Sequence, residues 1–246
     1  MRIGPFPVSS AQAFHVLSTR TGGAAENMAL DFLLLQRYPE AEAIRFRHYE
    51  WRRPAFTFGF GQKIAWVRAQ LSTEETVDLC RRPTGGGIVD HRHDWTYALV
   101  IPRGHDWWEA RATVSYRAVH ESLVQALREL GQPAALKQEP AAGAPPGATG
   151  ICFQQAELFD VVHERSGEKI AGAAHKRNKH GLLLQGSVWK PAVGAVDWDA
   201  LGGHFIAALA QAMGAALTPV PWPDLDEGEV GGLVEQYASP EWLEYR

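Results

Sequence analysis

The pattern of hydrophobic and polar positions predicts a chain in which helices alternate with short strands. Apolar residues recur at the spacing of an amphipathic helix in residues 26–37, 64–71, 114–130, 198–213 and 233–237. Alternating or short apolar runs of strand type occupy residues 44–51, 56–62, 76–79, 95–101, 158–162, 168–177 and 182–189. Residues 1–22 show no clear pattern. Many short strands among a few strong helices predict an α/β fold with a central, mixed, partly antiparallel sheet flanked by helices.

The sequence predicts a single domain over residues 1–246. The chain contains no internal repeat, and no linker is long enough to divide it. Its one low-complexity stretch, residues 140–150, is rich in proline and glycine. Such a stretch inside a domain is typical of a mobile surface loop, and we expect it to close over an active site.

Composition and charge exclude several classes of protein. The formal net charge of −4 argues against a nucleic-acid-binding protein. No apolar run is long enough to span a membrane, and the N-terminus lacks the apolar stretch of a signal peptide. The two cysteines, Cys80 and Cys152, form no C-x-x-C motif, which excludes a cysteine-rich zinc site. Scattered cysteines favour a reducing compartment, so we expect a cytoplasmic protein.

Three consecutive glycines, Gly85, Gly86 and Gly87, form the most unusual stretch of the chain. Arg81 and Arg82 precede them, and His91 follows. Because glycine loses more backbone entropy on folding than any other residue, such a run indicates a loop with positive φ or a close backbone approach. Arginines and bare amides suit an anionic or carbonyl-bearing ligand, while a tight turn with solvated charges explains the same residues equally well. The spacing matches neither GxxxxGK[ST] nor GxGxxG, the two glycine-rich nucleotide motifs.

Further blocks accompany the glycine loop in a fixed order. They are NMALD at 27–31, RxYxW at 47–51, TFGFGQ at 57–62, RRPTGGG with a histidine at 81–91, KIAGAA with an arginine at 169–177, and GS at 186–187. Together these blocks resemble the lipoate–protein ligase family, which includes the lipoyl and octanoyl transferases and shares a fold with biotin–protein ligases. The C-terminal YASxEW at 237–242 is similar to the ending of some members. The resemblance implies a biotin/lipoate protein ligase-like domain with a core of about residues 24–215 and a C-terminal extension over 216–246.

Two positions depart from the family pattern. The family usually has His-Asp where this chain has His91-Arg92, and His-Gly-Ser or His-Gly-Thr where it has Gln185-Gly186-Ser187. A glutamine donates and accepts hydrogen bonds but carries no proton at neutral pH. The departures concern the substrate more than the fold, and they leave open a divergent subfamily with altered activity.

The resemblance implies one of two reactions. Ligases activate lipoate with ATP, whereas cysteine-type octanoyltransferases carry the acyl group on an enzyme thiol. Cys152, eight residues before Asp160, stands where those transferases have their nucleophile. A thiolate exchanges with a thioester at little energetic cost, and the Lys169 ammonium would favour the thiolate. The alternative for Cys152 is a small buried apolar residue, which is also our interpretation of Cys80.

Lys169 is the second candidate catalytic residue. In a transferase it would lower the thiol pKa and hold the acyl carbonyl, and in a ligase it would contact the carboxyl or the adenylate phosphate. We expect the glycine loop and the Lys169 strand to face one elongated pocket with an apolar wall near Trp51 and Phe58. By the resemblance, the substrate-binding residues are Arg82, Thr84, Gly85, Gly86, Gly87, His91, Ala174, Arg177 and Gly186. We further expect a basic cluster at the pocket mouth, composed of Lys176, Arg177, Lys179 and His180.

The sequence therefore predicts an acyltransferase of protein lipoylation that moves an octanoyl or lipoyl group through a Cys152 thioester. The resemblance implies acyl carrier protein as donor and a lysine of a lipoyl domain or of a glycine-cleavage H-type protein as acceptor, with neither nucleic acid nor membrane as partner. No metal or cofactor is expected. One alternative is an ATP- and magnesium-dependent lipoate–protein ligase. The other is a non-catalytic homologue that binds acyl carriers, suggested by the missing histidine at position 185.

Overall fold

A computed structural model describes residues 12–71, 77–140 and 155–245. The strands are β1 (Gln12–Gly22), β2 (Ile44–Trp51), β3 (Ala55–Phe58), β4 (Asp78–Arg81), β5 (Ile88–Asp90), β6 (Asp94–Pro102), β7 (Ala134–Leu136), β8 (Val161–His163), β9 (Lys169–Asn178), β10 (Gly181–Trp189) and β11 (Ala215–Val220). The helices are α1 (Ala24–Gln36), α2 (Ile64–Gln70), α3 (Asp106–Glu109), α4 (Ala112–Glu129), the 3-10 turn η1 (Lys190–Ala192), α5 (Trp198–Met213), α6 (Glu227–Ala238) and α7 (Pro240–Glu244). No helix within these described ranges is long and apolar enough to cross a membrane.

The described strands form two sheets. Eight of them make a large mixed sheet in the order β11-β1-β2-β6-β10-β9-β8-β7, and three make a small sheet in the order β4-β3-β5. In the large sheet, β1 runs parallel to both β2 and β11, while the other neighbours are antiparallel. The mixed α/β fold expected from the sequence is thus confirmed.

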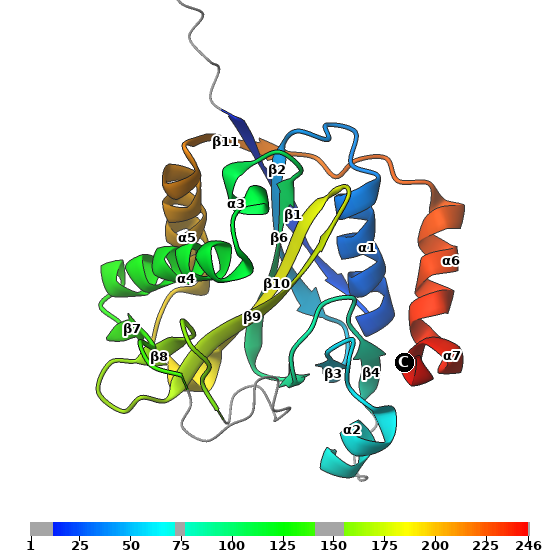
Figure 1. The fold of residues 1–246 in the computed structure, drawn as a ribbon, viewed down its shortest axis with the longest axis horizontal. Coiled ribbons are helices and arrows are strands. Elements are labelled where there is room, and N and C mark those ends of the chain that lie inside the picture. The colour runs from blue at the N-terminus through cyan, green and yellow to red at the C-terminus, as the bar shows by residue number, and fades with distance from the viewer. Residues whose placement is uncertain (1–11, 72–76, 141–154, 246) are drawn as a thin grey trace, which may run out of the picture.

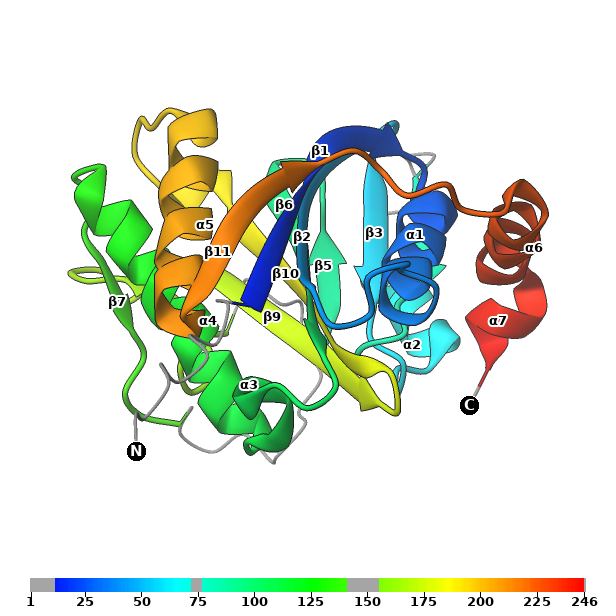
Figure 2. The ribbon, with the colours of Figure 1, turned by 90° about the horizontal axis from the view of Figure 1, so that it is seen from above.

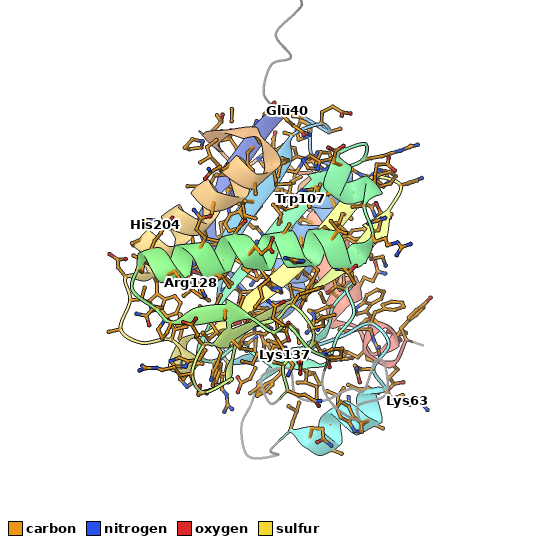
Figure 3. The ribbon with its side chains drawn as sticks, turned by 60° about the vertical axis from the view of Figure 1, so that its left-hand side comes forward. Glu40, Lys63, Trp107, Arg128, Lys137 and His204 are labelled. Carbon is orange, nitrogen blue, oxygen red and sulfur yellow. The ribbon has the colours of Figure 1, made fainter. Side chains whose placement is uncertain are left out.

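Helices cover both faces of the large sheet, as Figures 1 and 2 show, with α4 and α5 on one side and α1 and α6 on the other. Figure 3 looks onto the α4 layer, where His204 of α5 bonds Glu129 at the end of α4 with Nδ1 and Oε2 2.5 Å apart. Because both faces are covered, β10 is apolar on both: Leu182 and Leu184 pack under α4 and α5, and Leu183 packs under α1. The buried apolar residues are therefore divided between the two faces of the sheet.

Several elements differ from the expectation. Residues 12–22, which carry no clear pattern, form β1 between β2 and β11. β11 forms although it contains Pro219, because it lies at the sheet edge, where a missing N–H is tolerated. α6, which contains the helix predicted over 233–237, begins earlier than predicted, at Glu227. The preceding residue, Asp226, caps it by accepting a hydrogen bond from the Glu229 N–H. Residues 59–62 form a turn after β3 and do not continue the strand.

Candidate active site

The glycine loop connects β4 to β5 and packs against the turn that follows β3. Gly86 has a φ of +91°, which disfavours any residue with a side chain. A Cβ atom at Gly59 would lie 2.0 Å from the Gly86 carbonyl oxygen, so the two backbones pass too closely for a side chain. Gln62 Nε2 donates to the same carbonyl at 3.0 Å. Gly86 is therefore explained by its backbone conformation and Gly59 by close backbone packing, although Gly85 and Gly86 are themselves exposed.

Arg82 holds the glycine loop from inside. Its side chain is nearly buried, and Nη2 donates to the carbonyls of Gly85 at 2.8 Å and Gly87 at 3.0 Å. Its Nη1 donates to Thr57 Oγ1 at 2.8 Å. One guanidinium thus bridges the loop and β3. Its planar set of N–H donors can reach all three acceptors, which a single lysine ammonium could do less well.

A hydrogen-bonded chain of buried polar groups continues from Thr57 to His91 and Asp94. Thr57 Oγ1 lies 2.7 Å from His91 Nε2, and His91 Nδ1 lies 2.7 Å from Asp94 Oδ2. Because Thr57 accepts from Arg82, its own proton is available for Nε2, which assigns the histidine proton to Nδ1. The Ser187 hydroxyl also donates to Asp94 Oδ2. His91 is thereby fixed in orientation at one wall of the site.

Lys169 begins β9 with its ammonium bound to a buried carboxylate. Nζ lies 2.7 Å from Asp160 Oδ2, and the two side chains are 7% and 0% exposed. Asp160 is itself held by the Tyr116 hydroxyl and by the Glu157 N–H at 2.6 Å. A Cβ atom at Gly172 would lie 2.8 Å from Lys169 Cε and Nζ, so the absence of a side chain there makes room for the lysine. The ammonium is therefore held in one position at the start of the strand.

These elements enclose one cavity. Among the predicted site residues, its lining includes Arg82, Gly86, His91, Lys169, Ala174 and Gly186. The cavity space, its open mouth included, is about 510 Å³. The glycine loop reaches β9 closely, because a Cβ atom at Gly86 would lie 3.7 Å from Ala174 Cβ. As expected from the sequence, the glycine loop and the Lys169 strand face one pocket.

The cavity wall is partly aromatic. Trp51 lies on the lining and stacks on the His91 ring at 4.0 Å between centroids. Phe58, expected beside it, instead packs with Val67 and Ile88 in a separate buried cluster. A glycine is required at position 186 of the lining, since a Cβ atom there would lie 2.2 Å from the ring of Tyr97, which packs in the core with Phe46 and Phe205. An apolar tail can therefore lie against this wall, to which Trp51 contributes and Phe58 does not.

The other predicted residues take different positions. Thr84 is buried and donates to Gln185 Oε1 at 2.8 Å, so it supports the lining without belonging to it. Gly87 supplies a carbonyl to Arg82, and Gly85 has open space where a Cβ atom would stand. Cys152 lies outside the described residues, as does the segment 141–154 that contains it. Its role as nucleophile stays a prediction.

Arg177 is not brought to the cavity. In the β9–β10 pairing, Ala174 is opposite Gln185, whereas Arg177 is opposite Leu182, whose side chain packs under α4 and α5. Strand residues three apart point to opposite faces. Arg177 accordingly donates to the Ala110 carbonyl and lies 5.9 Å from the centroid of the Trp108 ring. Of the basic cluster expected at the mouth, Lys176 shares the Ala174 face and Arg177 does not.

A buried polar network behind the cavity was not identified from the sequence. Arg47 Nε binds Asp31 Oδ1 at 2.7 Å, with both side chains 0% exposed. Gln185 Nε2 donates to Asp31 Oδ2 at 2.6 Å, while its Oε1 accepts from Thr84. Burial raises the pKa of the Asp31 carboxyl, and the Arg47 charge opposes that shift. The sequence signal was that Asp31 and Arg47 belong to the NMALD and RxYxW blocks and that Gln185 departs from the family pattern. In the structure, Gln185 is an uncharged bridge between α1 and the glycine loop.

The arrangement suits chemistry at a carbonyl group. An ammonium and a rigid glycine-rich backbone face the same space, where they can stabilise negative charge that develops on oxygen. Within the described part of the chain, no group of three or more metal-ligating side chains is placed to hold a metal ion.

Sequence comparison finds relatives that are named octanoyltransferases. The chain is 32% identical over 184 residues to Octanoyltransferase LipM of Kyrpidia tusciae, a match covering 72% of this chain and 66% of that protein. It is 26% identical over 270 residues to Octanoyltransferase LipM of Symbiobacterium thermophilum, covering 93% and 97%. The Kyrpidia tusciae protein and three further relatives of the same name are spanned over only 58% to 66% of their length.

Solved structures show the same fold. The bipartite lipoate protein ligase of an archaeal lipoylation system, studied with its E2 lipoyl domain from Thermoplasma acidophilum, matches with a TM-score of 0.71 at 18% identity, over 95% of this chain and 96% of that one. Residues 23–189, more than half of the chain, match the family model described as the lipoyl protein ligase A/B catalytic domain. The chain therefore belongs to the lipoyl protein ligase A/B catalytic domain family.

Proposed function

We propose that this protein is an octanoyltransferase of protein lipoylation. The observation that carries the proposal is the Lys169 ammonium, held by Asp160 on the wall of the glycine-loop cavity, in a chain whose relatives are named octanoyltransferases. A cation at this place serves where an acyl carbonyl gains negative charge. The family match supports the same chemistry over residues 23–189.

The proposed reaction has two steps, acylation of Cys152 and transfer of the acyl group to the acceptor lysine. The Cys152 thiolate attacks the thioester carbonyl of an octanoyl–acyl carrier protein, and the carbon–sulfur bond to the donor breaks as the donor thiolate leaves and takes a proton. The amine of a lipoyl-domain lysine then attacks the enzyme thioester, loses a proton and releases Cys152. Both steps pass through an oxyanion that Lys169 and the glycine-loop backbone stabilise. Since the donor is already a thioester, neither ATP nor a metal is needed.

The partners in this proposal are an acyl carrier protein as donor and a lipoyl domain or H-type protein as acceptor. Its support is the family match, together with the lipoyl domain named alongside the archaeal ligase. Lys176 shares the cavity-side face of β9, where its Nζ lies 5.2 Å from the centroid of the Phe60 ring. Acidic carriers would be steered to such a charge. The cytoplasmic location rests on the cysteine content and stays a prediction.

The test is intact mass spectrometry after incubation with octanoyl–acyl carrier protein, with and without ATP. We expect one added octanoyl group without ATP, its loss on adding a lipoyl domain, and no thioester in Cys152→Ser. Cys80→Ser is the matched control and should acylate normally. Transfer that requires ATP and survives Cys152→Ala would identify a ligase, and no acyl-enzyme or product under any condition would identify a non-catalytic homologue.

The carrier contact has its own test. Lys176→Glu should raise the apparent KM for the carrier and weaken its salt dependence, because it reverses a charge on the cavity side. Arg177→Glu is the matched control, since that side chain lies on the opposite face of β9. Equal effects of the two variants would contradict the assignment of the cavity-side face as the carrier contact.

A further inference from the structure

The C-terminal helix α7 is bound to the strand that leads into the glycine loop. Arg81, 1% exposed, donates from Nε to the Trp242 carbonyl at 2.9 Å and from Nη2 to the Leu243 carbonyl at 2.6 Å. In return, Trp242 Nε1 donates to the Arg81 carbonyl at 2.9 Å. Figure 1 shows α7 beside β4, far in sequence from the loop that it contacts.

The same guanidinium also fixes the turn that supports the glycine loop. Arg81 Nη1 donates to the carbonyls of Phe60 and Gln62, the latter at 2.8 Å. Within that turn, Gln62 Nε2 binds the Gly86 carbonyl, and the Phe60 N–H donates to the Thr84 carbonyl at 2.8 Å. A continuous path of hydrogen bonds thus runs from α7 through Arg81 to Gly86, which lines the cavity.

Arginine is needed at position 81 because of the acceptor set. The acceptors named above are all backbone carbonyls, which stabilise a buried cation only when several converge on it. Two of them, from Trp242 and Leu243, lie in the last turn of α7, where the Trp242 carbonyl also accepts from the Tyr245 N–H at 3.2 Å. A guanidinium serves both groups at once, because its donors spread in one plane, whereas a lysine is a single point charge.

An aromatic cluster closes the junction. The Phe60 ring lies 5.9 Å from the Trp242 ring and 5.3 Å from the Tyr245 ring, measured between centroids. Arg81, Phe60 and Tyr245 line a groove of their own, separate from the catalytic cavity. The first arginine of the pair, grouped with Arg82 as a ligand contact by the sequence argument, therefore faces the C-terminal helix.

We propose that Arg81 is a positioning residue for the reaction and that α7 supports the substrate site from outside the cavity, because its contacts with Arg81 hold the 59–62 turn against the glycine loop. The inference rests on the proposed octanoyl transfer. Loss of the Arg81 contacts leaves the chemistry at Lys169 in place but loosens the backbone that receives the acyl donor. The effect should appear in donor binding and in the order of residues 84–87.

The experiment compares Arg81→Lys with Arg37→Lys. Arg37 binds Glu229 of α6 at 2.9 Å, so its variant removes a contact to the C-terminal region that does not reach the glycine loop. Acylation by octanoyl–acyl carrier protein gives kcat and KM, and hydrogen–deuterium exchange reports residues 84–87. We expect Arg81→Lys to raise the donor KM by about tenfold and to speed exchange of the loop, with neither change in Arg37→Lys.

Trp242→Phe keeps an aromatic side chain but removes the indole N–H that donates to the Arg81 carbonyl, and it replaces Arg81→Lys as the test variant if Arg81→Lys does not fold. We expect a smaller change in the same direction. A lowered melting temperature with unchanged KM and unchanged loop exchange would overturn the proposal, since that is the result of a merely structural role. If the wild-type protein forms no acyl-enzyme, the proposed function fails, while the exchange of residues 84–87 still decides whether Arg81 orders the loop.

Discussion

The substitution Gly172→Ala tests whether the position of the Lys169 ammonium controls the reaction. The new methyl group would lie 2.8 Å from Lys169 Cε and Nζ and 3.1 Å from Asp160 Oδ1, while ordinary contacts begin near 3.4 Å. Asp160 is held by Tyr116 and by the Glu157 N–H, so the lysine is the group that moves. Its end must withdraw by about 0.6 Å, the difference between those two distances.

The displacement should affect catalysis more than stability. The atoms in the way belong to the flexible end of a side chain, and alanine is favoured over glycine in a strand by about 0.5–1 kcal/mol, so unfolding free energy should change by about 1 kcal/mol or less. An ammonium displaced by a fraction of an ångström loses much of its hold on a developing oxyanion. We expect acylation to slow by about 10- to 100-fold.

The assay is single-turnover acylation by octanoyl–acyl carrier protein, followed by mass spectrometry and accompanied by chemical denaturation. Gly203→Ala is the matched control, because Gly203 is an exposed residue of α5 with no atom within 4 Å of the added Cβ. The control should acylate at the wild-type rate and gain up to about 1 kcal/mol of stability. A wild-type rate in Gly172→Ala would refute the reasoning and make Lys169 a bystander.

Three further predictions concern buried groups. Burial lowers the pKa of His120 to about 4, so between about pH 6.5 and 4 the unfolded chain binds a proton that the native protein does not bind. The free energy of unfolding should therefore fall by about 3 kcal/mol as the pH drops from about 6.5 to about 4. Denaturation curves at several pH values should show a weaker pH dependence in His120→Phe. Burial raises the pKa of the Cys80 thiol to about 12, so iodoacetamide should modify Cys80 only after denaturation. Labelling of Cys80 itself in the native protein, mapped by peptide mass spectrometry, would contradict this placement. Gln185→Glu would place a second buried carboxylate against Asp31 and should cost about 2–4 kcal/mol at neutral pH, less in acid; an unchanged midpoint in urea would show that the network relaxes freely.

The sequence by itself determined the longer helices α1, α4 and α5, the short helix α2 and most of the described strands, but it missed α3 and α7. Their signals are local: apolar residues three or four apart define α4 and α5, and short apolar runs define β6 and β10. The ordered blocks around the glycine loop also predicted the family and the pocket shared by Gly86 and Lys169. These features were accessible because each depends on residues close together in the chain or on their order along it.

Strand placement at the sheet edge required tertiary structure. β1 has a weak pattern and β11 contains a proline, yet each pairs with a neighbour far away in sequence, from Gln12 opposite Ala215 to Leu17 opposite Val220. Local propensity gives no information on such a partner, and pairing across the sheet outweighs it. Similarly, the side chain of Arg177 was assigned to the pocket by its motif, but the register of β9 against β10 places it on the opposite face.

The polar contacts that shape the site were also decided only by the folded chain. Thr84 meets Gln185 across 101 positions, Gln185 meets Asp31 across 154, and Arg81 meets the Trp242 carbonyl across 161. The motifs of the sequence include these residues but do not show their partners, because hydrogen bonding depends on distance and direction in space. Burial then makes the partners obligatory, since an unpaired polar group inside the protein costs more than the bond contributes.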